Sequence, residues 1–306
     1  METSPPSHHY RFSSVTDGVR AAIARPDGWG ICNSGLVDLG DGTLLFDSGM
    51  TPASASELRR EFEELFRGPP SVLANSHWHF DHSLGNQSFS GVPIWGTRRT
   101  REILLENHDQ LAAELTRESL EKEIADLGSK LDAARSDTAR RDVAFWIHMA
   151  RALLAFAGTT KIAPPGQTFE TKLDLPGSRG ARLLSFGPGH TEADAVLFLP
   201  NERVLFAGDL VCIGVQPSLQ SGDPRHWLQV LDELDRLRPE VVVPGHGPVV
   251  SLEQLSEARG YLTGVLAAAE AREGEPLPAS IRKWEGTLSL DGNLSFARRW
   301  IESHPP

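Results

Sequence analysis

Four loops that carry histidine or aspartate, each placed directly after a predicted strand, constrain the fold of this chain more than any other feature. The densest loop, residues 76–82, reads Ser-His-Trp-His-Phe-Asp-His and follows a predicted strand over residues 71–74. The other three carry His190, Asp209 and His246, which follow predicted strands over residues 182–186, 204–207 and 241–243. Loops at the carboxyl ends of strands line the ligand crevice of layered α/β proteins, so we expect these four to meet. Adjacent glycines would let the backbone approach a bound group closely.

The loop over residues 76–82 has the composition of a metal site. Imidazole nitrogens and carboxylate oxygens are ligands of zinc and of similar ions. Because residues i and i+2 of an extended or turning backbone project the same way, His77 and His79 can bind one ion. Asp81 and His82 turn aside and can bind a second ion. The alternative interpretation is a solvated polar loop without a ligand.

The rest of the pattern predicts a single α/β domain over residues 13–306, preceded by a loose polar tail over residues 1–12. Apolar runs at residues 31–39 and 43–46 flank Gly-Asp-Gly and predict a β-hairpin. Further strands are expected at residues 92–95 and 195–199, and helices at residues 53–66, 223–237 and 252–273.

Residues 97–157 differ in character from the strand-rich segments around them. They contain no proline, alternate charges of both signs and repeat leucine at helical spacing. We therefore predict two or three helices that form an inserted hairpin. Its second part is rich in large apolar side chains, which suits either a lid or pocket wall over the site or a homodimer contact.

Three residues are candidate substrate contacts. Trp29 stands between two glycines, which suggests an exposed side chain in a mobile loop. Trp146 and His148 lie on the apolar part of the insertion and could wall the pocket, although packing between helices is the plainer interpretation. The two cysteines, Cys32 and Cys212, are expected to be small packing residues.

Charge and composition exclude several classes of function. The net charge is −11, which disfavours a non-specific nucleic-acid binder because an acidic surface repels phosphate backbones. Two cysteines are too few for a disulfide scaffold or a cysteine-based zinc finger. We see neither a signal peptide nor an apolar run long enough to span a membrane, and therefore expect a cytoplasmic protein.

Taken in order, the segments LLFDSG, HWHFDH, GPGHT, AGD and PGHG resemble the metallo-β-lactamase-fold superfamily from about residue 30 to about residue 250, apart from the insertion. The resemblance implies an αββα sandwich with a dinuclear metal site between the ends of its sheets. It assigns the first metal to His77, His79 and His190, and the second to Asp81, His82 and His246, with Asp209 bridging both. It gives Asp47 a supporting or structural role behind the ligands.

A bridging aspartate resembles the glyoxalase-II-like thioesterases, lactonases and related hydrolases, whereas the true β-lactamases of the superfamily lack it. Within that group, segments such as GWGICNSGLV and ERVLFAGDLV are similar to bacterial hydrolases and ring cyclases of aromatic polyketide pathways. The resemblance implies two divalent ions, with zinc expected and iron or manganese as alternatives.

The expected reaction is hydrolysis of an ester, thioester, lactone or amide in a neutral or apolar small molecule. A hydroxide that bridges the metals would attack the carbonyl, and Asp81 would orient it as the catalytic carboxylate. The alternatives are a ring cyclase or lyase with the same site, an iron-dependent persulfide dioxygenase, and a binding module without catalysis.

Overall fold

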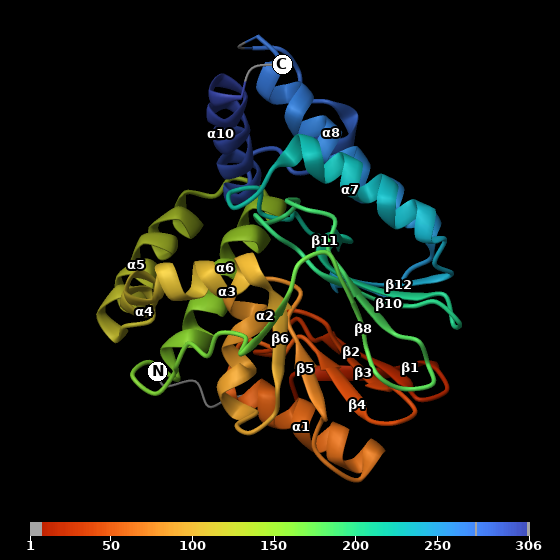
Figure 1. Ribbon diagram of the computed structural model, residues 1–306. Helices are drawn as coiled ribbons and strands as arrows, with labels where there is room; N and C mark the ends of the chain where they lie inside the picture. The colour runs from red at the N-terminus through yellow and green to blue at the C-terminus, as the bar shows by residue number, and fades with distance from the viewer. Residues whose placement is uncertain (1–7, 273, 305–306) are drawn as a thin grey trace.

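Two β-sheets face each other in the middle of the molecule, and helices cover both outer sides (Figure 1). The computed structural model describes residues 8–272 and 274–304. A seven-stranded sheet runs in the order β1 to β7, and a five-stranded sheet has the order β12-β11-β10-β9-β8. This arrangement confirms the predicted αββα sandwich.

The seven-stranded sheet combines an antiparallel and a parallel half. Its strands are β1 (Tyr10–Thr16), β2 (Val19–Ala24), β3 (Ser34–Asp38), β4 (Thr43–Phe46), β5 (Val72–Ala74), β6 (Ile94–Thr97) and β7 (Gln167–Phe169). The first four pair antiparallel, and β4 to β7 pair parallel. The predicted hairpin is confirmed as β3–β4. Residues 10–12 belong to β1, so the prediction of a loose tail is wrong for them, and residues 1–7 lie outside the described residues.

The five-stranded sheet carries the second half of the site. Its strands are β8 (Lys172–Asp174), β9 (Arg182–Leu184), β10 (Val196–Leu199), β11 (Val204–Cys212) and β12 (Val241–His246). β11 and β12 pair parallel, and the other neighbours pair antiparallel. The inner faces of both sheets share a core in which Leu183, Leu197 and Phe206 are buried. Each such side chain contributes about 1.5–3 kcal/mol by leaving water.

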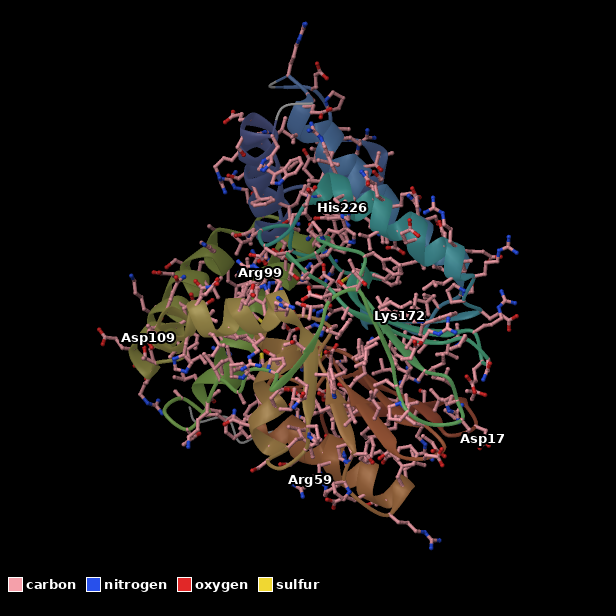
Figure 2. The ribbon with its side chains drawn as sticks, in the orientation of Figure 1. Asp17, Arg59, Arg99, Asp109, Lys172 and His226 are labelled. Carbon is pink, nitrogen blue, oxygen red and sulfur yellow. The ribbon has the colours of Figure 1, made fainter. Side chains whose placement is uncertain are left out.

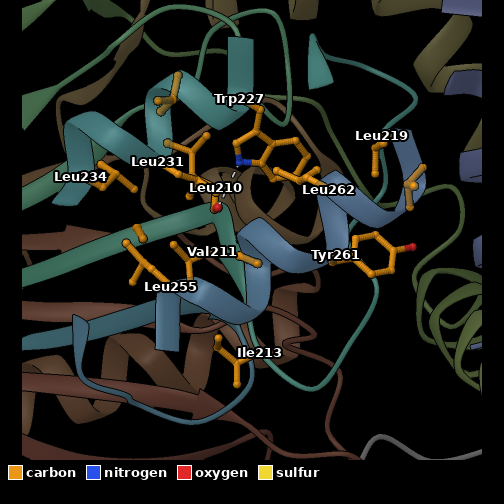
Figure 3. Packing of buried hydrophobic residues seen from close by; sticks show 14 of the residues in the cluster. Leu210, Val211, Ile213, Leu219, Trp227, Leu231, Leu234, Leu255, Tyr261 and Leu262 are labelled. Carbon is orange, nitrogen blue, oxygen red and sulfur yellow. Dashed lines mark hydrogen bonds between the residues drawn. The ribbon is translucent and has the colours of Figure 1, made fainter. Parts of the chain in front are cut away.

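Helices cover the outer faces because each presents one apolar side to a sheet. α1 (Pro52–Phe66) packs Leu58 and Phe62 against the seven-stranded sheet. On the other side lie α7 (Pro224–Leu237) and α8 (Leu255–Glu270), the latter preceded by η2 (Leu252–Gln254). Trp227 of α7 is buried in this layer, and its indole N–H donates to the carbonyl of Leu210 at 3.1 Å (Figure 3).

Asp223 caps α7, because its carboxylate accepts hydrogen bonds from the first-turn amides of Arg225 and His226. The charged side chains of Asp17, Arg59 and Asp109 point outward at the periphery of the molecule (Figure 2).

The insertion contains four helices within residues 98–154, more than the two or three predicted. They are α3 (Arg98–Glu106), α4 (His108–Glu114), α5 (Arg117–Ala133) and α6 (Asp137–Leu154). α5 and α6 form the expected hairpin beside the sandwich (Figure 1). The end of α6 packs Leu153 into a cluster with Met50 and Leu84, which fixes the insertion to the edge of the sandwich that carries the site.

Two C-terminal helices follow α8 and were not expected from the sequence. α9 (Ala279–Arg282) is a single turn, and α10 (Leu288–Ser303) packs beside α8 and reaches the insertion at its first turn (Figure 1). None of the helices over residues 8–272 and 274–304 has the length and apolar character needed to cross a membrane.

Candidate metal centre

The structure brings all seven candidate ligands to one edge of the sandwich. The loop after β5 carries His77 and His79, and it continues into α2 (Phe80–Ser83) and η1 (Leu84–Ser88), with His190 in the loop after β9. Asp209 and His246 lie inside β11 and β12, because both strands run longer than predicted. The pairing of these strands continues past an irregularity at Gly208, whose φ is 53°.

Two glycines allow the close packing of the ligands. A Cβ on Gly245 would lie 1.9 Å from an oxygen of Asp209, and one on Gly208 would lie 2.7 Å from the Cβ of Ser76. Neither contact is sterically possible, so both positions require glycine. Both glycines thus permit close packing around the ligands, and close approach of the backbone to a bound group stays a prediction.

His77, His79, His190 and Asp209 form the first cluster, in which one ligand atom of each lies within 4.8 Å of the others. His79 Nδ1 is 2.9 Å from His190 Nε2, and His190 Nε2 is 3.4 Å from Asp209 Oδ2. His79 Nε2 faces the hydroxyl of Ser221 at 3.1 Å. Since Nε2 is hydrogen-bonded outward, Nδ1 is the nitrogen that His79 turns toward the cluster.

Asp81, His82 and His246 form the second cluster, which lies on the other side of Asp209. His246 Nε2 lies 3.2 Å from Asp81 Oδ2 and 3.3 Å from Asp209 Oδ2. His82 Nε2 lies 3.1 Å from Asp209 Oδ1. The carboxylate of Asp209 therefore stands between both sets of imidazoles, as its expected bridging position requires.

Asp47 and Ser76 form hydrogen bonds to ring nitrogens of two candidate ligands, on the side of each ring that faces away from the site. Asp47 Oδ2 accepts from His82 Nδ1 and from the Ser76 hydroxyl, both at 2.8 Å, and Oδ1 accepts from the Ser76 amide at 2.7 Å. The Ser76 hydroxyl also lies 2.9 Å from His77 Nδ1. These contacts occupy the Nδ1 atoms of two histidines and leave their Nε2 atoms for a ligand, an arrangement common around protein metals. Asp47 thus has the supporting position expected for it.

Buried atoms without hydrogen-bond partners show that the residues fit a cation. His77 Nε2 is buried and forms no hydrogen bond with any described residue, and the buried atoms His82 Nε2 and Asp209 Oδ1 lie 3.1 Å apart without the geometry of a hydrogen bond. Buried polar atoms are normally satisfied, and unpaired ones mark a missing water or ion. Nitrogen and oxygen donors in these numbers suit zinc and related divalent ions.

The electrostatics of the two halves differ. Burial and the nearby His190 lower the pKa of His79 to about 3, and burial with its neighbouring histidines lowers the pKa of His77 well below its usual range. Burial opposes protonation of His246 as well, but Asp209 and Asp81 outweigh it and raise the pKa of His246 to about 10. The first half thus offers neutral imidazoles, whereas the second half holds positive charge against its carboxylates. A divalent cation would replace that charge.

The three candidate substrate contacts, Trp29, Trp146 and His148, make contacts with other parts of the protein. Trp29 is 4% exposed and packs edge-on against Phe156, so the expectation of an exposed tryptophan is wrong. Trp146 donates its indole N–H to Ser289 of α10 at 3.0 Å, and His148 Nε2 lies 2.7 Å from the carbonyl of Gly28. All three hold the insertion in place, and contact with a substrate stays a prediction for each.

Sequence reasoning missed three polar residues next to the ligands. Ser76 adjoins the histidine motif and could have been suspected from that position. Cys32 donates its thiol to the carbonyl of Asp81 at 2.9 Å, which makes it more than a packing residue. Ser221 lies in the loop between β11 and α7, and no sequence signal marks it.

Comparison with known proteins agrees with this arrangement. The family model of the metallo-beta-lactamase superfamily matches residues 27–246. The chain is similar to a linear primary-alkylsulfatase of a Pseudomonas species, with 25% identity over 235 residues that cover 72% of this chain and 43% of that protein. It is also similar to the probable metallo-hydrolase YqjP of Bacillus subtilis, with 24% identity over 238 residues that cover 72% of this chain and 69% of the relative. The match thus spans less than half of the alkylsulfatase.

Solved structures share the fold. A metallo-beta-lactamase from Pontibacter korlensis has a TM-score of 0.59 at 20% identity, covering 83% of this chain and 99% of that one. The metallo-beta-lactamase FIM-1 from Pseudomonas aeruginosa, in a mono-zinc form, has a TM-score of 0.60 at 14% identity, covering 86% and 97%. The expected enzyme class, a metal-dependent hydrolase of this fold, is confirmed at the level of the superfamily. With its motifs, sandwich and ligand clusters in agreement, the chain belongs to the metallo-beta-lactamase superfamily.

Proposed function

We propose that this protein is a dinuclear zinc hydrolase that cleaves an ester, thioester, lactone or amide in a neutral or apolar small molecule. The observation that carries the proposal is the position of Asp209, whose two carboxylate oxygens lie 3.1–3.4 Å from imidazole nitrogens of both clusters. One carboxylate shared by two sets of ligands supports a pair of ions rather than a single one.

Seven residues would hold the ions. His77, His79 and His190 would hold the first, Asp81, His82 and His246 the second, and Asp209 would bridge them. When bound, such a pair would lower the pKa of a nucleophilic water, so that hydroxide is available near neutral pH, and would polarise the carbonyl under attack.

The chain's own residues position the reaction. Burial would raise the pKa of Asp81, but His82 and His246 hold it well below its usual range, so this carboxylate stays ionised near neutral pH. An ionised Asp81 can accept a hydrogen bond from the nucleophile and take its proton. Asp47 keeps His82 in the tautomer that presents Nε2 to the site.

The test is the metal content of the purified chain combined with one variant pair. Elemental analysis should give about two divalent ions per chain for the wild type, and Asp209→Ala should lose one of them together with most of the turnover of an aryl ester or a lactone. Asp109→Ala, which removes a fully exposed carboxylate, should retain both ions and full turnover. A wild-type content of one that does not change when zinc is added would overturn the bridging role of Asp209.

Similarity to an alkylsulfatase favours a second candidate, hydrolysis of a sulfate ester at the same site. A panel that contains an aryl ester, a lactone and a primary alkyl sulfate separates the two hydrolase candidates by their kcat/KM values.

The two remaining alternatives, a ring cyclase and a persulfide dioxygenase, are distinguished by other measurements. A ring cyclisation would release a product without oxygen from solvent water, and a persulfide dioxygenase would contain one iron and consume oxygen.

A further inference from the structure

The loop over residues 213–223, between β11 and α7, contacts the metal centre through backbone and side chain, and the Ile213 amide donates to the carbonyl of His246 at 3.0 Å. Its Ser221 hydroxyl lies 3.1 Å from Nε2 of His79, the imidazole whose Nδ1 faces the first ligand cluster. The hydroxyl therefore accepts the N–H of His79 and orients the ring, as outer hydrogen-bond partners of metal-bound histidines do. The loop lacks helix or strand. Beside Ser221, the Asp223 amide donates to the Gly189 carbonyl at 3.1 Å and the Gly222 amide to the Leu219 carbonyl at 3.4 Å, so whatever holds Leu219 also bears on the position of Ser221.

Asn293 of α10 holds this loop from outside. Its Oδ1 accepts from the amide of Leu219 at 3.0 Å, and its Nδ2 donates to the carbonyl of Pro217 at 2.8 Å and lies 2.9 Å from the hydroxyl of Tyr261. Asn293 is 1% exposed. Both donors and the acceptor of one buried amide are thus in use, and two of the three contacts reach the loop. Figure 3 shows Tyr261 with its ring at the apolar cluster and its hydroxyl directed away from it.

A second contact fixes the start of the loop to the first turn of α10. Gln216 Nε2 donates to the hydroxyl of Thr287, the residue that caps α10, at 3.1 Å. Next to this cap, the Ser289 hydroxyl donates to Asp142 of α6 and accepts from the indole of Trp146. Hydrogen bonds therefore connect the insertion to the first turn of α10, and the same turn to the loop that carries Ser221.

We propose that α10 is a positioning element of the metal centre, with Asn293 as a positioning residue that acts on His79 through the loop and Ser221. This inference rests on the proposed metal site. It assigns a role to a helix that lies outside residues 27–246, the part of the chain that the family model matches. Asn293 is a buried polar residue on the face of α10 that otherwise packs Leu290 and Leu294. Packing alone would favour an apolar side chain there, whereas holding the loop requires the amide.

The test compares Asn293→Ala with Ser221→Ala and with a control on the same helix. Zinc affinity, measured by competition with a chromophoric chelator, should fall by about 10–100-fold in both variants. The double variant should lose no more than the larger single loss, because both changes remove the same support. Leu294→Ala, which removes apolar packing from the same helix but none of the hydrogen bonds that Asn293 makes to the loop, should retain wild-type zinc affinity. An equal loss in Leu294→Ala, or an unchanged affinity in Asn293→Ala, would overturn the proposal.

A second measurement does not need bound metal. In the metal-free protein, the backbone amides of residues 216–221 should exchange with deuterium faster in Asn293→Ala than in the wild type. The exchange rates should be unchanged in Ser221→Ala, because Asn293 holds the backbone of the loop whereas the Ser221 hydroxyl only contacts His79. If Asn293→Ala does not fold, Gln216→Ala tests the same loop from its less buried anchor and should show faster exchange with weaker zinc binding. A wild-type chain that binds no divalent ion would refute the proposed function, whereas unchanged exchange in both Asn293→Ala and Gln216→Ala would refute the role of α10.

Discussion

At the scale of single residues, Asp47 is the side chain on which both ligand clusters depend most directly. Asparagine preserves its size and tolerates its left-handed φ of 60°. The amide nitrogen, however, would replace the oxygen that accepts from His82 Nδ1 and from the Ser76 hydroxyl. We expect Asp47→Asn to weaken binding of the second ion by about 10–100-fold, as measured by zinc competition. The exposed Asp41→Asn is the matched control, and equal affinities for both variants would refute a supporting role.

Asp194 gives the metal-free protein a pH-dependent stability. It is buried beside Thr191, and burial raises its pKa to about 7 in spite of the hydrogen bonds from Thr191. An unfolded aspartate has a pKa of about 3.9, so the folded chain binds more protons between these values. The contribution of Asp194 is therefore present below about pH 4 and is lost as the pH rises through 7.

The corresponding experiment is urea unfolding of the metal-free wild type and of Asp194→Asn. From pH 5 to pH 8 the wild type should lose about 2–3 kcal/mol more of its free energy of unfolding than the variant, which cannot titrate at this position. Parallel pH profiles for the two proteins would show that Asp194 is already ionised at pH 5.

Candidate metal ligands that lie in one contiguous motif could be predicted from the sequence. Residues that reach the site only through tertiary contacts could not. His77, His79 and His82 could be recognised as metal ligands from their spacing on one loop. Ser221 reaches His79 across 142 positions of sequence, and its neighbours Gln220 and Gly222 carry no metal-like pattern. Cys32 follows Ile31, whose φ of 68° is rare for a β-branched residue and is not readable from the sequence.

At the scale of elements, α6 is attached to α10 through Trp146 rather than suspended over the site. Removing this half-buried indole also removes its hydrogen bond to Ser289, so Trp146→Ala should lower the free energy of unfolding by about 2–3 kcal/mol. Phe145, which is 41% exposed, should cost less than about 0.5 kcal/mol when changed to alanine. Urea unfolding measures both changes.

Light scattering on the same two proteins addresses the expectation of a homodimer. If Phe145→Ala alone converts a dimer into monomers, the outer face of the insertion is an interface. If the oligomeric state is unchanged and Trp146→Ala raises KM while zinc content stays constant, the insertion acts as a pocket wall. A Trp146→Ala protein as stable as the wild type would contradict the attachment of α6 to α10.

Elements with a strong period or a buried apolar run were predictable, such as β3–β4, α1 and α7. The β1–β2 hairpin was not, because Arg11, Ser13 and Ser14 make β1 polar and its stability comes from pairing with β2. α10 contains Gly292 and Asn293 in its interior, both unfavourable in an isolated helix. The packing of α10 on α8 and the hydrogen bonds of Asn293 compensate for this low helix propensity, and neither can be read from the sequence.

At the scale of the whole molecule, the shared sandwich says less about chemistry than the ligands do. The solved β-lactamases cited above are at most 20% identical to this chain, so the likeness extends to the fold alone. In the structure the carboxylate of Asp209 lies between the two clusters, and we expect the choice of substrate to follow from it.

We therefore expect weak or absent hydrolysis of β-lactams compared with esters or thioesters. A bridging carboxylate adds negative charge between the two ions, which reduces the stabilisation available to the nitrogen anion that leaves a β-lactam ring. Alkoxide and thiolate leaving groups need less help of this kind. Steady-state kinetics on a penicillin, an aryl ester and a thioester, all with the same zinc-loaded preparation, make the comparison. Penicillin turnover with a kcat/KM of about 10⁵ M⁻¹s⁻¹ or more would show that the bridging position of Asp209 does not restrict the substrate, since such values lie within the ordinary range for an enzyme acting on its own substrate.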